Sequence, residues 1–293
     1  MRRRAAASIA ALCLVVALVV ASVVAGCSSG AASSHAASSG TASSHAAEPA
    51  NLTIYAASSL GSVLTRVKSV YEAAHSGTTL TISTDSSAAL EIKIEQGAPA
   101  DVFLSADAAN PQKLVDAGLV AGSPTRFAAN LLTVVVPTGN PARIETPADL
   151  ARPGVKVIAA GDAVPITKYA AQLVANLAGL PGYPSDFAAR YAANVVSRQD
   201  NVSAIVAQIA LGEGDAGIVY ITDARTSTQI QTIAVPEAAN VRATYAGVVV
   251  LASGRASNGA GPEAAEAAEA FLAWLAGPEG QAILASFGFL PAI

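Results

Sequence analysis

Short apolar runs alternate with amphipathic stretches along most of the chain, and this alternation constrains the fold more than any other feature. The run LTIYAA at 52–57 is typical of a buried strand, and the following SSLGSVLTRVKSVYEAAH places its apolar residues on one face of a helix. The same order of strand, serine or proline turn and helix returns at 79–97 and at 155–180. The pattern predicts an α/β protein with largely parallel sheets.

The length of the chain predicts two lobes. At 293 residues it exceeds the usual size of a single hydrophobic core. Hydrophobic residues make up 52% of the composition and charged residues 13%, which excludes a disordered acidic or basic protein. The composition leaves the class of function open.

The N-terminus carries an export signal. Three arginines follow Met1, an uncharged apolar run covers 5–24, and VAGC stands at 24–27. Small residues before a cysteine resemble a lipobox, so we expect residues 1–26 to be a lipoprotein signal peptide and Cys27 to be lipidated. An uncleaved membrane anchor is the alternative, because the apolar run is nearly long enough to span a bilayer. Both alternatives predict that the rest of the chain lies outside the cytoplasmic membrane.

Residues 27–50 are predicted to be a low-complexity tether. The segment is rich in serine and alanine, and ASSHAA occurs in it twice. His35 and His45 in these repeats are interpreted as part of the tether rather than as metal ligands, and the sequence has no metal-site spacing of histidine, cysteine or carboxylates. Cys13 lies within the signal, so the mature chain would keep Cys27 alone and form no internal disulfide.

The charge balance is acidic, with 17 Lys and Arg against 21 Asp and Glu. No nucleic-acid partner is expected, because nucleic acid requires a basic face. Open α/β sheets bind ligands at the carboxyl ends of their strands, where helix N-termini carry free N–H groups and partial positive charge. Several such turns predict an anion receptor that needs no lysine or arginine. Helix capping alone is the other role open to the serines at these turns: Ser58, Ser59, Ser86 and Ser87.

Five segments of the chain, in order, match one known family. They are YAASSL at 55–60, TDSSAALEIKIEQGAPADVFLSAD at 84–107, VPITKYA at 164–170, QDNVSAIVAQIALGEGDAGIVYITDA at 199–224 and GPEGQAILASFGF at 277–289. Together they resemble the periplasmic molybdate-binding component of ABC importers, the ModA family, from about Leu52 to the C-terminus.

The resemblance implies a bilobal periplasmic-binding-protein fold of type II, in which two α/β lobes close over a ligand cleft between them. It assigns residues 51–131 together with 243–293 to lobe I, and residues 132–242 to lobe II.

In this family a tetrahedral dianion is held wholly by neutral donors. By motif position, the resemblance assigns that role to the hydroxyls of Ser59 and Ser87, the main-chain N–H groups of Ile166 and Val202, and the hydroxyl of Tyr220. Ser58 is the less favoured neighbour of Ser59. The five residues would hold molybdenum only as its oxyanion, with no direct cation site.

A donor-only site suits molybdate and tungstate, which are fully deprotonated at neutral pH. Hydrogen phosphate carries a proton that needs an acceptor, so such a site disfavours it. Sulfate has the same charge and shape, and only cavity size could exclude it. Asp101 and Asp107 are expected to hydrogen-bond loops behind the serine helix, because carboxylates that faced a dianion would repel it.

The sequence therefore predicts a monomeric extracytoplasmic lipoprotein that captures molybdate or tungstate and delivers it to an ABC permease, with the lipid on Cys27 as its membrane contact. No cofactor is expected. Nor is an enzyme, because no catalytic set of Ser, His, Asp or Lys stands at a recognisable spacing. The alternatives are a receptor for another oxyanion such as sulfate, and a non-transport surface or sensing lipoprotein.

Three departures from the family pattern fall in the second lobe. The loop GDAVP is shortened, VPIT replaces smaller residues, and Ser203 in DNVS replaces an arginine. Main-chain donors do not depend on side-chain identity, but the length of the loop moves them.

Overall fold

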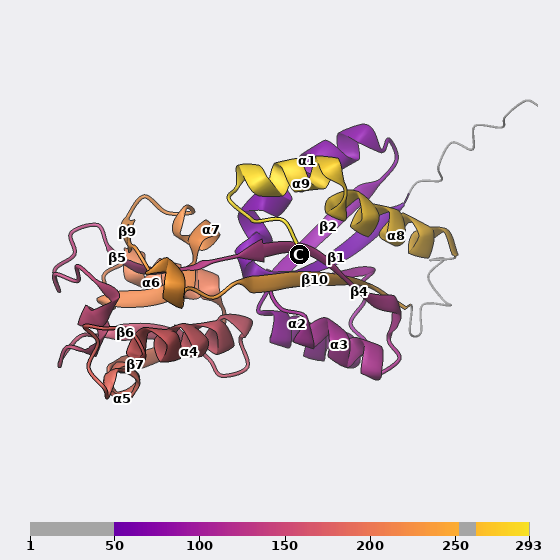
Figure 1. Cartoon of the computed structure of the whole chain (residues 1–293). Helices are drawn as coiled ribbons and strands as arrows, with labels where there is room; N and C mark the ends of the chain where they lie inside the picture. Colours follow the sequence, from indigo (N-terminus) through magenta and orange to yellow (C-terminus); the bar gives the residue numbers. More distant parts are fainter. Residues whose placement is uncertain (1–49, 252–261, 293) are drawn as a thin grey trace, which may run out of the picture. The chain divides into compact units, whose positions relative to one another are not determined.

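The computed structural model describes residues 50–251 and 262–292 (Figure 1). The predicted signal peptide, Cys27 and nearly all of the predicted tether lie outside these residues. None of the helices within the described ranges is long and apolar enough to cross a membrane.

The first of two five-stranded sheets is built from both ends of the folded chain. Its parallel strands are joined through helices, whereas the last strand enters antiparallel between two of them. The strand order is β2 (Thr79–Asp85), β1 (Asn51–Ala57), β3 (Val102–Ser105), β10 (Ala243–Val250) and β4 (Val120–Asn130). The sheet is therefore mixed, and in it the predicted parallel pairing holds for β1, β2 and β3.

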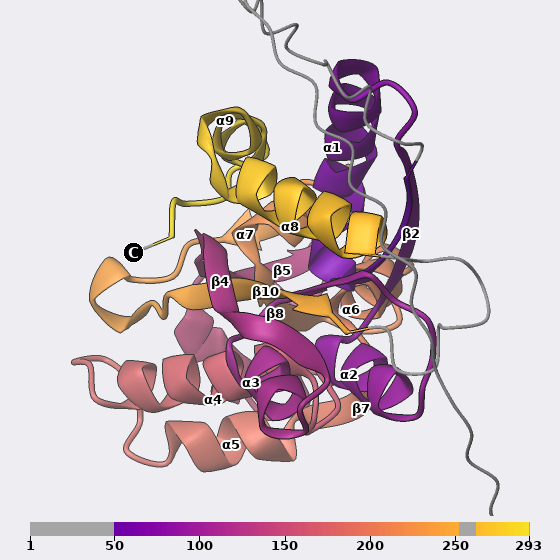
Figure 2. The same cartoon turned by 90° about the vertical axis from the view of Figure 1, so that its right-hand side faces the viewer.

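Helices cover both faces of this sheet, as the two views in Figures 1 and 2 show. One face carries α1 (Gly61–Ala74), α8 (Pro262–Ala276) and α9 (Pro278–Ser286). The other carries α2 (Ser87–Glu95) and α3 (Ala109–Asp116). The predicted apolar face of α1 is confirmed, since Val63, Leu64, Val67 and Tyr71 are buried.

The second sheet is formed by the middle of the chain. Its order is β7 (Val195–Gln199), β6 (Val157–Ala160), β8 (Ala216–Tyr220), β5 (Leu132–Pro137) and β9 (Ile230–Ile233). Its helices are α4 (Pro165–Ala178), α5 (Phe187–Ala193), α6 (Val202–Ala210) and α7 (Ile221–Ala224). Short 3-10 turns stand at η2 (Pro147–Ala151) and η3 (Glu237–Ala239). Strand β6 is parallel to β7 and β8, whereas β5 is antiparallel to both of its neighbours.

The chain passes between the sheets twice, from β4 into β5 and from β9 into β10. The two passages are tied together by Asn240, whose side chain accepts from the Leu132 N–H at 3.0 Å and donates to the Leu132 carbonyl at 2.9 Å. This double contact holds the two passages together at the start of β5.

The helix starts differ in how they are capped. Ser86 caps α2 by accepting from the Ala89 N–H at 3.2 Å, and Asn201 caps α6 by accepting from the Ala204 N–H at 3.1 Å. The interpretation of Ser58 or Ser59 as a cap is wrong, because the chain enters α1 through the 3-10 turn η1 (Ser58–Leu60) without a side-chain cap. The Ser59 hydroxyl therefore does not cap α1 and can hydrogen-bond another group.

The two aspartates of the segment 97–107 have structural contacts, as predicted. Asp101 accepts from the Thr53 N–H at 2.6 Å, which ties the start of β3 to β1. Asp107 accepts from the Asn110 N–H at 3.0 Å and from the Ser105 hydroxyl at 2.9 Å. Both carboxylates therefore stabilise the turns around β3.

Candidate anion-binding site

The residues predicted to bind the anion line one small cavity. Ser59 lies in η1 and Ser87 opens α2, both beside the first sheet. Ile166 is the second residue of α4, Val202 is the first residue of α6, and Tyr220 ends β8, all in the second sheet and its helices. Elements of both sheets thus contribute donors to the same space.

The wall of this cavity carries no charged side chain. The lining residues are Ala57, Ser58, Ser59, Ser86, Ser87, Ala106, Val164, Pro165, Ile166, Val202 and Tyr220. The cavity measures about 10 Å³, which is near the lower limit for one water molecule. A tetrahedral oxyanion is larger than water, so its entry requires the wall to move outward.

Three helices, α2, α4 and α6, begin with residues that line this wall. The first N–H groups of a helix have no intrahelical partner and carry the positive end of the helix dipole. Pro165 opens α4 and has no N–H, so Ile166 provides the first amide of that helix. Val202 provides the first amide of α6. An anion in the cavity would meet partial positive charge from α2, α4 and α6.

The Ser87 hydroxyl is oriented by a backbone group. Its oxygen accepts a hydrogen bond from the Ala106 N–H at 3.0 Å, and Ser87 is 1% exposed. A main-chain N–H can only donate, so the Ser87 proton is left free to donate elsewhere. The neighbouring Ser86 is the helix cap, so Ser87 is not needed to cap α2.

Ala106 directly follows β3 and lines the cavity. The sequence predicted loop contacts for Asp101 and Asp107 in this segment and gave Ala106 no role. Its N–H holds the Ser87 hydroxyl, so this backbone position takes part in the wall. A backbone role of this kind has no side-chain signature in the sequence.

Tyr220 presents an unpartnered hydroxyl. The residue is 1% exposed, and its hydroxyl has no hydrogen-bond partner among the described residues. Burial raises the pKa of Tyr220 well above its ordinary value, so the group is a neutral O–H donor. Buried polar atoms nearly always have a partner in folded proteins. An unpaired donor in this wall therefore indicates an acceptor that the site binds from solution.

The nearby Asp223 is also buried, and burial raises its pKa to about 8. Its carboxyl group is 3% exposed and accepts from the Tyr220 backbone, while its Oδ2 atom has no partner among the described residues. At neutral pH the carboxyl group is therefore mostly protonated, and it adds little negative charge near an anion.

Side-chain contacts from the start of α6 connect the two halves of the fold. The Ser203 hydroxyl donates to the Ser58 carbonyl at 3.4 Å, and the Asn201 side chain hydrogen-bonds the Asp85 carboxylate. Ser203 stands where the family pattern has an arginine, so in this chain a short neutral side chain makes the contact from the start of α6.

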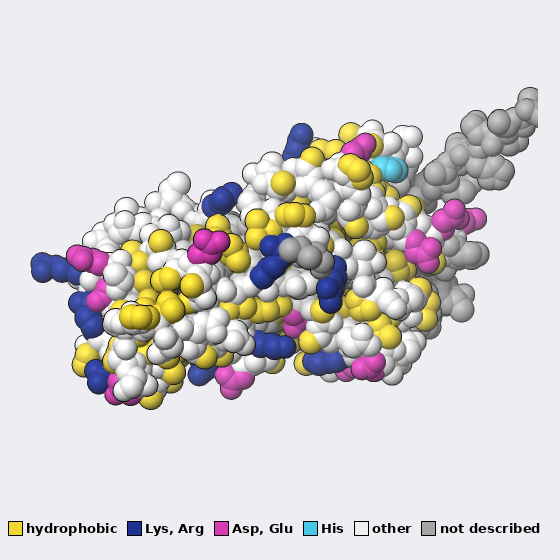
Figure 3. Space-filling view, viewed as in Figure 1, with side chains coloured by type: hydrophobic (Ala, Val, Ile, Leu, Met, Phe, Trp, Pro, Cys, Tyr) yellow, Lys and Arg dark blue, Asp and Glu magenta, His cyan; other side chains and the backbone are white. Residues whose placement is uncertain are grey.

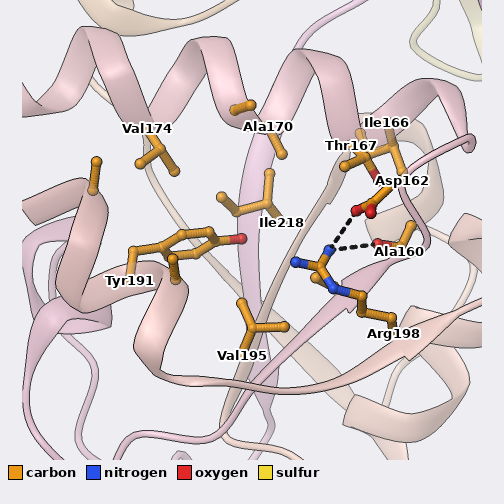
Figure 4. Close-up of a pocket in the computed structure, with 14 residues that line it drawn as sticks. Ala160, Asp162, Ile166, Thr167, Ala170, Val174, Tyr191, Val195, Arg198 and Ile218 are labelled. Atoms are coloured by element: carbon orange, nitrogen blue, oxygen red, sulfur yellow. Dashed lines mark hydrogen bonds and ion pairs between the residues drawn. The ribbon is translucent and has the colours of Figure 1, made fainter.

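A second, larger pocket lies on the far side of α4, between α5, β6 and β7 (Figure 4). It measures about 270 Å³ and is lined mainly by apolar side chains, among which burial raises the pKa of Tyr191 to about 12. Arg198 at its edge donates to the Ala160 carbonyl and pairs with the Asp162 carboxylate, both at 3.2 Å. The arginine charge is already compensated, and the pocket is unsuited to a small dianion. Of the five predicted residues, only Ile166 also lines it.

Comparisons with known proteins agree on the family of this chain. The family model described as "Bacterial extracellular solute-binding protein" matches residues 52–290. The chain is 32% identical over 240 residues to the molybdate-binding protein ModA of Mycobacterium bovis, a match that covers 82% of this chain and 84% of the relative.

Two solved structures share the fold. The periplasmic molybdate-binding protein of Azotobacter vinelandii matches with a TM-score of 0.66 and 23% identity, over 83% of this chain and 100% of that chain. The sulfate-binding protein SubI of Mycobacterium tuberculosis matches with a TM-score of 0.69 and 23% identity, over 83% of this chain and 87% of that chain. The likeness confirms the predicted type II periplasmic-binding-protein fold. Together with the sequence matches, it shows that the chain belongs to the bacterial extracellular solute-binding protein family and is of the ModA type.

Proposed function

We propose that this chain captures molybdate outside the cytoplasmic membrane, with tungstate as a second ligand of the same chemistry. The observation that carries the proposal is the unpartnered Tyr220 hydroxyl in an uncharged cavity that also holds Ser59 and Ser87. The 32% identity to a molybdate-binding protein supports the choice of this oxyanion.

The proposed ligands are the five donors of the cavity: the hydroxyls of Ser59, Ser87 and Tyr220 and the main-chain N–H groups of Ile166 and Val202. Burial of a dianion is costly unless its oxygens meet donors, and hydrogen bonds to a charged group are about twice as strong as neutral ones. Every one of these groups can donate to an oxygen. The cavity wall has no carboxylate to accept the proton of hydrogen phosphate, so the site disfavours that anion.

We further propose that residues 51–131 with 243–293 form one lobe, that residues 132–242 form the other, and that the ligand stabilises the closed arrangement. All five donors reach one anion only when both lobes contact it, so binding shifts the population toward closure. An ABC permease would receive the closed, loaded protein. The chain then acts as a monomer without enzymatic activity or cofactor, tethered to the membrane by a lipid on Cys27.

The surface in Figure 3 fits a soluble carrier of this kind. On the face shown, basic and acidic side chains are interspersed with apolar ones over both sheets and their helices. This mixed face suits neither nucleic acid nor an anionic lipid surface, which bind extended basic patches.

A thermal melt of the purified protein with excess molybdate, tungstate, sulfate or phosphate tests the proposal. Ligand at about 100 times its dissociation constant adds about 2.7 kcal/mol, which for a chain of this size raises Tm by about 5–10 °C. The expected result is a shift with molybdate and tungstate and none with phosphate.

Sulfate is the second candidate, because the fold of a sulfate-binding protein matches this chain with a TM-score of 0.69. A shift with sulfate as well would mean a general site for tetrahedral oxyanions. A shift with none of the four anions would contradict the proposal and favour a surface or sensing lipoprotein.

A further inference from the structure

One buried tyrosine touches the candidate site without lining it. Tyr245 lies in β10, is fully buried, and places its hydroxyl oxygen 2.9 Å from the Ser59 hydroxyl oxygen. Its ring packs edge-on against Phe127, Phe289 and Tyr220. The two hydroxyls are 186 positions apart in sequence, so only the fold brings them together.

The direction of this hydrogen bond follows from the need of a buried proton for an acceptor. Within the described ranges, the Ser59 oxygen is the acceptor found at hydrogen-bond distance from the Tyr245 hydroxyl. In the opposite direction Ser59 would donate and the Tyr245 proton would remain buried without a partner, which is costly. The favourable direction is therefore from Tyr245 to Ser59.

Asn130 supports the same direction. Its side-chain oxygen accepts from the Leu131 N–H at 3.0 Å, and its nitrogen donates to the Thr222 hydroxyl at 2.8 Å. Burial raises the pKa of Tyr245 well above its ordinary value, so the hydroxyl keeps its proton and needs an acceptor. The Asn130 oxygen is already engaged by the Leu131 N–H, so the Tyr245 proton is directed toward Ser59.

We propose that Tyr245 is a positioning residue that fills the acceptor side of Ser59 and so fixes the Ser59 hydroxyl as a donor to the bound anion. The proposal rests on the proposed function. The Ala106 N–H acts on Ser87 in the same way. It can only donate, so it fills the acceptor side of the Ser87 hydroxyl. Both serines then present protons to the cavity, because the acceptor side of each is filled by a donor of the protein.

The strands around this contact are tied to the second sheet. Thr222 lies in α7, directly after β8, whereas Asn130 ends β4 and Tyr245 lies in β10. The Asn130 side chain donates to the Thr222 hydroxyl at 2.8 Å, which links β4, the neighbour of β10, to a helix of the second sheet.

The test is a double-mutant cycle on molybdate affinity, measured by isothermal titration calorimetry on the purified protein. Tyr245→Phe keeps the buried ring and removes only the hydroxyl. It should weaken molybdate binding about tenfold, the usual effect of one well-placed hydrogen bond. Because Tyr245 acts through Ser59, Tyr245→Phe should have no further effect in the Ser59→Ala background.

Tyr169→Phe is the matched control. Tyr169 packs against Tyr220 with a centroid distance of 6.3 Å, and its hydroxyl accepts from the Thr244 N–H, away from Ser59. This variant should bind molybdate as the wild type does.

The outcomes separate the positioning role from the proposed function. If the wild type binds molybdate and Tyr245→Phe binds it equally well, the positioning role is overturned while the function stands. Additive losses in the double variant would also overturn it, since they would mean that Tyr245 acts through the fold and not through Ser59. If the wild type binds none of molybdate, tungstate and sulfate, the proposed function fails and takes the positioning role with it.

Discussion

The Asn240 side chain pairs with both backbone groups of Leu132, accepting from its N–H at 3.0 Å and donating to its carbonyl at 2.9 Å. Leu132 opens β5, where the chain enters the second sheet, and Asn240 lies on the return path toward β10. The Asn240 side chain thus makes two hydrogen bonds to Leu132 of the kind that a neighbouring strand would make. It also joins the two passages between the sheets.

Replacement of Asn240 should destabilise the folded protein through these two contacts. Asn240→Ala leaves a buried N–H and a buried carbonyl of Leu132 without partners, so we expect a loss of about 2–4 kcal/mol in the free energy of unfolding. Asn240→Asp keeps an acceptor for the N–H but turns a carboxylate oxygen toward the Leu132 carbonyl, so it should be destabilised as well. Urea denaturation measures both, and equal stability of Asn240→Ala and wild type would contradict the assignment.

Ser86 and Ser87 are adjacent but should respond differently to replacement. Ser87→Ala removes a donor from the cavity and should weaken molybdate binding by about ten- to a hundredfold. It also leaves the Ala106 N–H without its acceptor and should lower stability by about 1–3 kcal/mol. Ser86→Ala removes the cap of α2 and should lower stability by about 1 kcal/mol. Calorimetric titration and urea denaturation of the two variants provide mutual controls. Equal losses of affinity would remove the distinction between cap and ligand.

Tyr220→Phe should change stability and affinity in opposite directions. The unliganded protein buries the hydroxyl without a partner, so its removal should leave stability unchanged or raise it by about 1–3 kcal/mol. The same change removes a donor to the anion and should weaken binding about tenfold or more. Thermal melts with and without molybdate measure both effects in one experiment. A variant that is destabilised but binds normally would mean that Tyr220 is a core residue only.

Asp223 should make the folded protein less stable as pH rises. Burial raises its pKa from 3.8 to about 8, so between these values the native state holds a proton that the unfolded state releases. The contribution to stability is full below about pH 4 and falls by up to about 1.4 kcal/mol per pH unit until about pH 8.

Asp223→Asn cannot lose this proton and keeps a side-chain acceptor for the Tyr220 backbone. Relative to wild type, the variant should therefore gain stability on going from pH 5 to pH 8, because the other titrating groups are common to both proteins. Urea denaturation at the two pH values measures the difference. If the gap between the proteins does not change with pH, Asp223 does not titrate as described.

The sequence predicted the elements whose residues follow a simple period. The strands β1, β2 and β6, and the helices α1, α2 and α4 that follow them, all follow from local pattern. The long strand β4 and the short strands β7 and β9 did not, since VAGSPTRFAAN contains glycine and proline and the others alternate only briefly. Pairing with neighbours from elsewhere in the chain decides such segments.

The site residues came from motif resemblance, and the contacts that orient them came from the structure alone. Ser59 and Ser87 could be named from their segments, but the groups that direct their protons could not. Tyr245 looks like an ordinary core tyrosine in a buried strand, and the Ala106 N–H has no side chain to mark it. Both contacts join residues of different elements, 186 and 19 positions apart, and a single sequence carries no signal of such pairing.

The most direct test of the central claim is calorimetric titration of molybdate into the wild type and into the Ser59→Ala, Ser87→Ala double variant. The wild type should bind one molybdate per chain, and the double variant should show almost no binding while melting as a folded protein, because two of the five donors are gone. Unchanged affinity in the folded double variant would contradict the assignment of this cavity as the anion site.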